Sequence, residues 1–284
     1  MGPLFSFQIV SRGEPSLSDC LKSISAQSDR DFEVTLVTTE ASTREAIGAL
    51  PFEVNSVLVD RKTRLLEARR IANVSSSGEW AILLDARRIL MPNFAASLRS
   101  MHTSADLVVI PERGRYTTRW GSVGALDKDI VNRRSNLRDS LSRREPVILP
   151  RCFRRTLLSA AFRKLERDLG EALMKQVVYG DHYLLYLASL AEEPRMAVDW
   201  DSTILHLEEA DFKETIMKYF AYGRSQTVLK RQDAYPAART PRMSPRTIEG
   251  VSTGDAVALA FLYALRSASF ACGYLLPDWR TRGG

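Results

Sequence analysis

Two carboxylates occupy positions from which they could take part in a reaction. Asp85 follows the unbroken apolar run WAILL at 80–84, which predicts a strand covered on both faces. It opens the mixed acidic and basic cluster DARR at 85–88. Because open α/β sheets bind ligands at the carboxyl ends of their strands, we expect this cluster to face a ligand. Asp181 begins a helical run, where a carboxylate serves either as an N-cap or, beside a substrate hydroxyl, as a general base.

The elements that must position these carboxylates alternate along the chain. Apolar runs and alternating patterns predict strands at 4–10, 34–37, 54–59, 80–84, 106–110 and 200–207. Helix formers and apolar residues at helical spacing predict helices at 16–24, 67–75, 93–101, 181–187, 212–230 and 255–276. We therefore predict an α/β fold with a mixed, largely parallel, Rossmann-like sheet, helices on both faces and a C-terminal helical extension.

The composition limits the classes of function. The chain has 284 residues, of which 45% are hydrophobic, enough for a packed core. Its net charge is +6, and 32 of its 40 basic residues are Arg, a side chain that pairs bidentately with phosphate. Diphosphates and anionic lipid surfaces fit this charge. No helix-turn-helix, zinc-finger or ribonucleoprotein pattern accompanies it, so we expect no nucleic-acid partner.

Cysteine usage and the N-terminal residues predict the compartment. Cys20, Cys152 and Cys272 are far apart, odd in number and without metal-ligand spacing, which indicates free thiols in a reducing environment. No basic segment followed by an apolar core opens the chain, so no secretory signal is predicted. We expect a cytoplasmic protein, either free or peripheral on the cytoplasmic membrane face.

The segment ARRIANVSSSGEWAILLDARRILMP at 68–92 resembles the donor-site segment of a known family. Family 2 inverting glycosyltransferases of the GT-A fold usually carry ARNxGIxxAxGEYIxFLDADDxxxP. Matching residues fall at the same spacing without a gap at Ala68, Arg69, Gly78, Glu79, Leu84, Asp85, Ala86 and Pro92. Shorter segments at 27–34, 150–158, 179–187 and 219–225 resemble later elements of the family in the expected order.

The resemblance implies a nucleotide-sugar donor bound at the carboxyl ends of the strands. The positions that would bind the donor are Ser11, Arg12, Thr39, Glu40, Arg69, Asp85, Arg87 and Arg88. At 38–39 the chain has two threonines where the family usually has aspartates, and a hydroxyl cannot reproduce a carboxylate that accepts from two donors. Glu40 could substitute for them, and a surface turn capped by Thr39 is the alternative.

By the same resemblance, Asp181 is the catalytic base. It would remove a proton from the acceptor hydroxyl as that oxygen attacks the anomeric carbon from the face opposite the leaving diphosphate. Gly180 and Leu187 depart from the Glu and Arg of the family pattern. Further candidates for phosphate or acceptor contacts are Arg151, His182, His206 and Arg224, and for each of them the alternative is a purely structural role.

The metal of the family is placed in question by two substitutions. The resemblance implies Mg²⁺ or Mn²⁺ held by the later aspartates of the DADD element, where this chain has Arg87 and Arg88. A guanidinium repels a divalent cation and binds diphosphate itself. We therefore expect no metal, with Arg87 in its place, aided by Arg88 or Arg69. If a metal is present, its expected ligands are Asp85 and His206.

The chain is predicted to divide into a nucleotide-sugar-binding half (1–115), an acceptor-binding and catalytic half (116–230), a linker (231–254) and an amphipathic helical segment (255–284). The Arg-rich stretch 113–144 is either a lid or a charged helix around 129–141. Arg266 interrupts the apolar stretch 255–276, and its cost in lipid argues against a membrane span. Contact with a membrane surface, with the domain or with a second subunit is favoured instead.

Two functions remain open. The first is an active inverting glycosyltransferase without a metal, acting on an unidentified acceptor that is lipid-linked, a polysaccharide or of another kind. The second is an inactive relative that binds a nucleotide sugar or scaffolds another enzyme, because several aspartates of the family pattern are replaced. No phosphate loop, GxGxxG, HExxH or GxSxG motif offers a competing chemistry.

Overall fold

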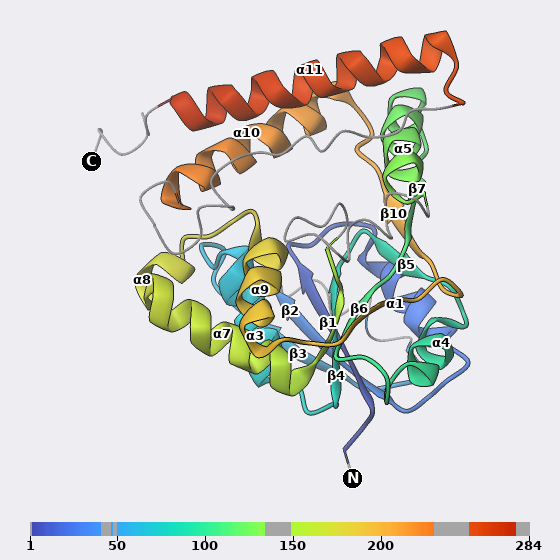
Figure 1. Cartoon of the computed structure of the whole chain (residues 1–284), viewed down its shortest axis with the longest axis vertical. Helices are drawn as coiled ribbons and strands as arrows, with labels where there is room; N and C mark the ends of the chain where they lie inside the picture. Colours follow the sequence, from blue (N-terminus) through green and yellow to red (C-terminus); the bar gives the residue numbers. More distant parts are fainter. Residues whose placement is uncertain (1, 41–46, 48–49, 134–148, 230–249, 277–284) are drawn as a thin grey trace.

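A seven-stranded mixed sheet forms the centre of the molecule (Figure 1). The computed structural model describes residues 2–40, 47, 50–133, 149–229 and 250–276, and every structural statement below concerns these residues. The strand order is β3-β2-β1-β4-β8-β6-β9. The first four strands in this order run parallel, β8 is antiparallel to β4 and β6, and β6 runs parallel to β9. The strands are β1 (Phe5–Ser11), β2 (Phe32–Thr38), β3 (Val54–Leu58), β4 (Trp80–Asp85), β6 (Leu107–Val109), β8 (Cys152–Arg154) and β9 (Met196–Val198).

A second, three-stranded sheet was not predicted. Its order is β5-β10-β7, with β10 antiparallel to β5 and parallel to β7. The strands are β5 (Arg88–Leu90), β7 (Glu112–Arg115) and β10 (Ile204–Leu207). Two strands of the small sheet follow strands of the large sheet closely in sequence: β5 comes after β4, and β7 after β6. The small sheet therefore lies beyond the carboxyl ends of β4 and β6. It therefore forms one wall of the space where ligands bind in such folds.

The helices of the α/β part are α1 (Leu17–Ser25), α3 (Leu65–Val74), α4 (Phe94–Ser100), α7 (Arg155–Leu169), the short α8 (Glu171–Met174) and α9 (Asp181–Ser189). A single turn of 3₁₀ helix, η2 (Leu190–Glu192), follows α9. Three further helices lie on the same side of the core in Figure 1: α5 (Arg119–Val131), α10 (Phe212–Leu229) and α11 (Thr253–Leu275).

The sequence of β4 explains why helices cover both faces of the large sheet. Its first five residues are apolar and fully buried, and successive side chains of a strand point to opposite faces. Trp80, Ile82 and Leu84 enter the core cluster that includes α1 and α4. Ala81 and Leu83 enter the cluster that includes α7 and α9. The predicted α/β class, with a mixed, mostly parallel sheet and a C-terminal helical extension, is confirmed.

Helices α10 and α11 cross at two glycines. A Cβ on Gly223 of α10 would overlap the carbonyl oxygen of Phe270, and a Cβ on Gly273 of α11 would overlap the carbonyl oxygen of Phe220. The two backbones therefore approach each other as closely as only glycine allows. This reciprocal contact fixes α11 against the rest of the chain.

We expect Gly273→Ala to destabilise the protein, because the added methyl group must force the two helices apart. Overpacking of this kind costs about 1–3 kcal/mol, which exceeds the gain in helix propensity of up to ~1 kcal/mol. Urea unfolding of the two proteins measures the difference. Gly254→Ala is the matched control, because a Cβ there meets only the Ser252 hydroxyl at 4.0 Å. Equal stability of the two variants would contradict the packing argument.

Among the described helices, α11 alone has the length and apolar composition of a membrane span. Its outer face exposes Val257, Phe261 and Leu275, which are 66%, 54% and 73% accessible. Arg266 instead points toward α5, where its Nη1 lies 2.6 Å from Oδ2 of Asp127. The residue that interrupts the apolar run thus makes an ion pair within the domain. Contact of the outer face with a membrane or a second subunit, and a cytoplasmic location, stay predictions.

Several predicted boundaries need correction. The strand predicted at 200–207 is confined to Ile204–Leu207, and the strand predicted at 106–110 to Leu107–Val109. Helix α5 spans Arg119–Val131 and is capped by the Thr118 hydroxyl, which accepts from the backbone N–H of Gly121. It contains only the first residues of the charged helix placed around 129–141, and 134–141 lie outside the described residues. Residues 134–148, which include the last part of the predicted lid (134–144), lie outside the described residues, as does most of the predicted linker. The division into two halves near residue 115 stays a prediction.

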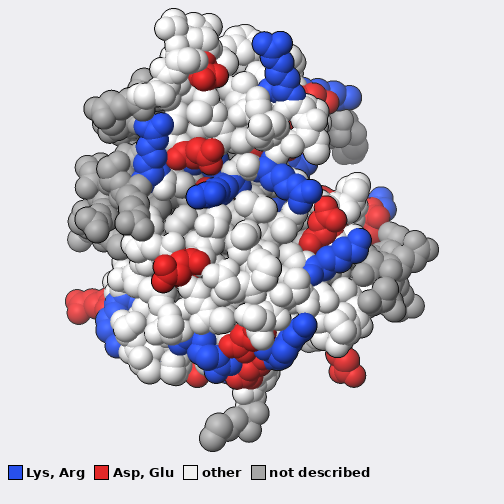
Figure 2. Space-filling model, turned by 90° about the vertical axis from the view of Figure 1, so that its right-hand side faces the viewer, with Lys and Arg blue, Asp and Glu red and all other residues white. Residues whose placement is uncertain are grey.

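The charges on the face shown in Figure 2 are mixed. Basic and acidic side chains lie close to one another there, and the described part of this face carries no continuous basic stripe. A nucleic-acid backbone is usually bound by such a stripe. The described part of this face therefore does not have the basic stripe that a nucleic-acid backbone would bind.

Candidate functional site

The carboxyl ends of β1, β2 and β4 place the predicted donor-binding residues along one edge of the large sheet. The register pairs Ser11 with Thr38 and Val10 with Asp85, so the three strands end at the same level. Thr39 and Glu40 continue from β2 at this edge. The arrangement agrees with the expectation that ligands bind at the carboxyl ends of parallel strands.

Arg69 joins this edge to the predicted catalytic base. The Arg69 side chain is 1% exposed, and its Nε lies 3.4 Å from Oδ2 of Asp181. Its Nη1 donates to the carbonyl oxygens of Leu84, at the end of β4, and of Gln8 in β1, the latter at 3.4 Å. One buried guanidinium on α3 thus connects two strands with the first residue of α9, 112 positions along the chain. Two residues that the sequence could only name separately are brought together.

Burial and charge oppose each other at Asp181. Burial raises the pKa of this carboxyl, and although Arg69 and then Arg151 lower it, the pKa stays above its usual value. Nε2 of His182 lies 3.6 Å from Oδ2 of Asp181. Burial lowers the pKa of His182 well below its usual range, and the positive charges of Arg69 and Arg151 lower it further. The imidazole is therefore neutral, while Asp181 holds a proton more tightly than an ordinary aspartate.

Asp85 has the opposite balance. Burial raises the pKa of Asp85, but the positive charges of Arg88, Arg151 and Arg69 together lower it by more than burial raises it. The pKa therefore lies below its usual range. Nε of Arg88 is 3.4 Å from Oδ2 of Asp85, and the backbone N–H of Arg87 donates to Oδ1 at 3.1 Å. Asp85 is therefore a permanently charged acceptor, and Asp181 is the carboxylate whose protonation can change in a reaction.

Glu112, at the start of β7, is the centre of a buried charge network. It is paired with Arg151 through its Oε1, and with Lys128 at 2.9 Å and Arg88 at 3.7 Å through its Oε2. Burial raises its pKa, but Arg151, Arg88 and Lys128 lower it well below its usual value. Removing any one partner would leave a buried charge without full compensation. Glu112 therefore holds Arg88 and Arg151 in place.

Arg87 points in another direction. Its guanidinium is paired with Glu214 near the start of α10 and lies 3.9 Å from Glu209. Lys218 is also paired with Glu209. The loop after β4 is thereby attached to the C-terminal helices through Arg87.

A cavity of about 270 Å³ lies between the small sheet and helices α5, α10 and α11. Four of the predicted site residues line it: Arg88, Arg151, His182 and His206. His206 is 5% exposed, and its Nδ1 lies 2.7 Å from Oε1 of Glu208. The cavity also receives Lys218 and Arg266 from the C-terminal helices. The wall opposite the small sheet is therefore built by the helical extension.

The other predicted residues described below are not among the described residues that line this cavity. The Ser11 hydroxyl donates to Glu14 at 2.7 Å, and Arg12 is exposed. Glu40 pairs with Arg61 at 3.4 Å near the end of β2. Arg224 lies in α10, where Gly273 of α11 passes its backbone, and it is not among the described residues that line the cavity. The structure thus does not bring Arg224 to the site.

Sequence reasoning missed several residues that the structure places at the cavity: Glu112, Asp127, Lys128, Glu208 and Lys218. Glu112 carried a usable signal, because it follows the apolar run at 107–110 in the way that Asp85 follows 80–84. Arg266 was named only as a break in an apolar helix. A single charged residue in an otherwise apolar helix was a second signal, because such a residue usually pairs with a partner inside the fold.

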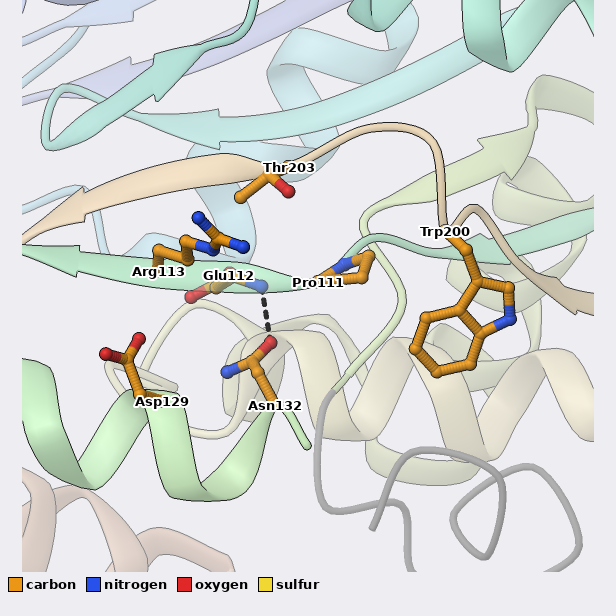
Figure 3. Close-up of a pocket in the computed structure, with 7 residues that line it drawn as sticks. All are labelled: Pro111, Glu112, Arg113, Asp129, Asn132, Trp200 and Thr203. Carbon is orange, nitrogen blue, oxygen red and sulfur yellow. Dashed lines mark hydrogen bonds between the residues drawn. The ribbon is translucent and has the colours of Figure 1, made fainter. Parts of the chain in front are cut away.

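A second cavity of about 440 Å³ adjoins the first, and Glu112 and Asn132 line both. Figure 3 shows Arg113 of β7 and Asp129 of α5 on one side of it and Trp200 on the other. The backbone N–H of Glu112 donates to the side-chain oxygen of Asn132, which joins the end of α5 to the small sheet. Trp200, which also packs against Val109 and Val198, lines the cavity beside these charges.

The residues around Asp85 do not fit a divalent metal ion. Within the described residues, no three or more His, Cys, Asp or Glu side chains are grouped to hold one. Asp85 is surrounded by guanidinium groups, and Nδ1 of His206 is engaged by Glu208. Mg²⁺ and Mn²⁺ need several oxygen ligands with a net negative charge, whereas this arrangement would repel them.

The strand order defines an α/β protein in which carboxylates lie at the carboxyl edge of the sheet. The sequence matches no protein-family profile and no curated protein sequence. The fold is similar to the crystal structure of S. aureus TarS 1–349, with 16% identity, a TM-score of 0.45, and coverage of 100% of this chain and 74% of that chain. The same protein in complex with UDP-GlcNAc gives 14% identity and a TM-score of 0.44, with coverage of 94% and 73%. Its complex with UDP gives 15% and 0.46, with coverage of 84% and 68%.

Proposed function

We propose that this protein is an inverting glycosyltransferase that uses a nucleotide-sugar donor. The observation that carries the proposal is the placement of Asp181 beside Arg69 and the end of β4, at the edge where Asp85 stands. These residues occupy the motif positions at which the chain resembles the family, and a cavity lined by His182, the neighbour of Asp181, lies next to them. Such a transfer needs a carboxylate that acts as a base, a carboxylate that accepts hydrogen bonds from the donor, and cationic side chains near the diphosphate.

In this mechanism Asp181 removes the proton of the acceptor hydroxyl, and the oxygen attacks the anomeric carbon while the bond to the diphosphate breaks. The raised pKa of Asp181 makes it a stronger base than an ordinary aspartate. Arg69 orients the carboxylate and keeps it close to the strand ends. Asp85, held ionised by its guanidinium neighbours, accepts hydrogen bonds from the donor's ribose or sugar hydroxyls.

The guanidinium groups take the place of the metal in this proposal. Arg88 faces the cavity, and Arg87 stands one residue nearer to Asp85 in the loop after β4. Fixed cations aimed at a departing diphosphate stabilise its charge without reorganising during the reaction. The ion pairs with Asp85, Glu112 and Glu214 order these side chains when the protein folds, so that less conformational entropy is lost when a ligand binds.

A thermal-shift screen against UDP-, GDP- and dTDP-sugars tests the donor class. A donor present at about 100 times its dissociation constant should stabilise the fold by roughly 2.7 kcal/mol. We expect the shift to persist in EDTA and not to increase with Mn²⁺, and turnover to behave in the same way. A metal-dependent glycosyltransferase treated in parallel should lose activity in EDTA. Loss of activity in EDTA followed by recovery with Mn²⁺ would contradict the metal-independent mechanism.

One observation favours a second candidate, an inactive relative that binds a nucleotide sugar. Arg87 is already paired with Glu214 and lies close to Glu209, so its charge is partly neutralised before a ligand arrives. A residue occupied in this way can serve as a structural link in place of a diphosphate contact. Donor binding without turnover under any condition, and with no effect of Asp181 substitutions, would favour this candidate.

A further inference from the structure

Two guanidinium groups reach the 270 Å³ cavity from opposite walls. Arg88 comes from β5 of the small sheet and Arg266 from α11 of the C-terminal pair. The two residues are separated by most of the chain and share no element. Both are more than four-fifths buried, with side chains 8% and 13% exposed.

Both groups keep nitrogen atoms that lack a hydrogen bond. Nε and Nη1 of Arg88, and Nε of Arg266, are buried and make no hydrogen bond in the part of the chain that the structure describes. The carboxylates nearest to Arg88, of Asp85 and Glu112, approach these nitrogens at 3.4 and 3.7 Å without forming one. A buried charged donor without an acceptor is costly, so an oxygen-bearing ligand placed between the two groups would relieve that cost.

The donors of the cavity, and not its summed charge, indicate the chemistry of this ligand. Five cationic side chains line it, against three carboxylates, and each of the carboxylates already has a cationic or imidazole partner. Asp127 pairs with Arg266 and accepts from the Tyr263 hydroxyl, while Glu208 pairs with His206. Two of the five cations also pair with carboxylates outside the lining, Lys218 with Glu209 and Arg88 with Asp85. The ligand is therefore indicated by the guanidinium N–H groups that lack an acceptor, and guanidinium groups bind phosphate oxygens in bidentate fashion.

We propose that this cavity binds a phosphate-class anion between Arg88 and Arg266, so that the C-terminal helix α11 completes the substrate site. The choice of ligand rests on the proposed transferase function, in which the anion is either the donor diphosphate or a phosphate group of the acceptor. The packing of α10 on α11 at Gly223 and Gly273 then has a role in binding, because it sets the position of Arg266.

Titration calorimetry with pyrophosphate tests the proposal on the full chain. We expect the wild type to bind, and Arg266→Gln to weaken binding about tenfold or more, since the lost hydrogen bonds are to a charged group. Asp127→Asn should strengthen binding, because it removes the carboxylate that competes for Arg266 while keeping an oxygen to accept from Tyr263. Arg167→Gln, at an exposed position of α7, is the matched control and should bind as the wild type does.

A merely structural role of Arg266 would predict a different pattern. Both Arg266→Gln and Asp127→Asn would then lower the melting temperature and either leave pyrophosphate affinity unchanged or reduce it in parallel. That result, or the absence of binding at millimolar pyrophosphate, would overturn the proposal. Because Arg88 is buried among carboxylates, Arg88→Gln can fail to fold, so the Arg266 and Asp127 variants decide the question.

Two further experiments identify the source of the anion and test the anion site separately from the transferase activity. Displacement of pyrophosphate by UDP would assign the site to the donor, and simultaneous binding of both would assign it to the acceptor; either result supports the anion site. A protein with the expected pyrophosphate pattern but no sugar transfer keeps the anion site and loses the transferase proposal. If the protein transfers sugar but Arg266→Gln leaves its affinity for pyrophosphate unchanged, the transferase proposal is kept and the anion site is lost.

Discussion

Asp181→Asn is expected to reduce sugar transfer by roughly 10²–10⁴-fold, the range that a positioned general base contributes. Asparagine keeps the shape of the side chain and can still accept from Arg69, but it cannot take the proton of the acceptor hydroxyl. The affinity for the donor, measured by thermal shift, should be retained because Asp85 and the strand ends are unchanged. Asp201→Asn, at an exposed aspartate outside the cavity, should transfer sugar at the wild-type rate.

The pH profile provides a second readout for the same residue. Since burial raises the pKa of Asp181 more than Arg69 lowers it, the acidic limb of kcat/KM should rise at a higher pH than an ordinary aspartate gives. The folded state also binds this proton more tightly than the unfolded chain. Asp181 therefore favours folding at pH values below its unfolded pKa, and this contribution is lost as pH rises through the raised folded pKa. Both effects should be absent in Asp181→Asn, and their persistence there would show that another group titrates.

Arg69→Met is expected to have the largest effect on stability. It removes a fully buried charge and leaves Asp181 and the carbonyl oxygens of Leu84 and Gln8 without their donor. Breaking a buried ion pair on one side costs about 3–5 kcal/mol, measurable as the free energy of urea unfolding. The pKa of Asp181 should also rise further, because Arg69 is its largest lowering influence.

Arg70→Met is the matched control for this change. Arg70 is the next residue of the same helix, but it is 37% exposed and pairs with Glu67 one turn earlier, an interaction worth less than ~1 kcal/mol. Adding Asp181→Asn to Arg69→Met should restore part of the lost stability, because no charged carboxylate is then left unpaired. An Arg69→Met protein as stable as the Arg70→Met protein would show that the buried pair contributes nothing.

The sequence predicts the α/β frame because its signals are local. Each signal lies within one short, continuous stretch of sequence. These stretches are the apolar run before Asp85, the helix that begins at Asp181 and the segment from Ala68 to Pro92. The small sheet could not be predicted in the same way. Its strand β7 is ERGR and has no apolar residue, and β5 is RIL, which is too short to show a strand period.

The site was predictable only in part for a related physical reason. Asp85 could be named from its position at the end of a strand and Asp181 from the family resemblance of its segment, but their connection through Arg69 depends on how α3 and α9 pack. The partners of Glu112 come from β5, α5 and the segment before β8, and no periodicity along the chain relates them. Long-range ion pairs of this kind follow from the assembled fold and leave no spacing signal in the sequence.

The ion pair between Asp127 and Arg266 joins residues 139 positions apart, and this separation bears on how the protein is made. During synthesis the α/β core, with both carboxylates, emerges before α11 and can begin to fold first. Until α11 docks, the cavity lacks Arg266, one of the three arginines that line it. The proposed anion site is therefore complete only after the last described helix has been synthesised and has docked.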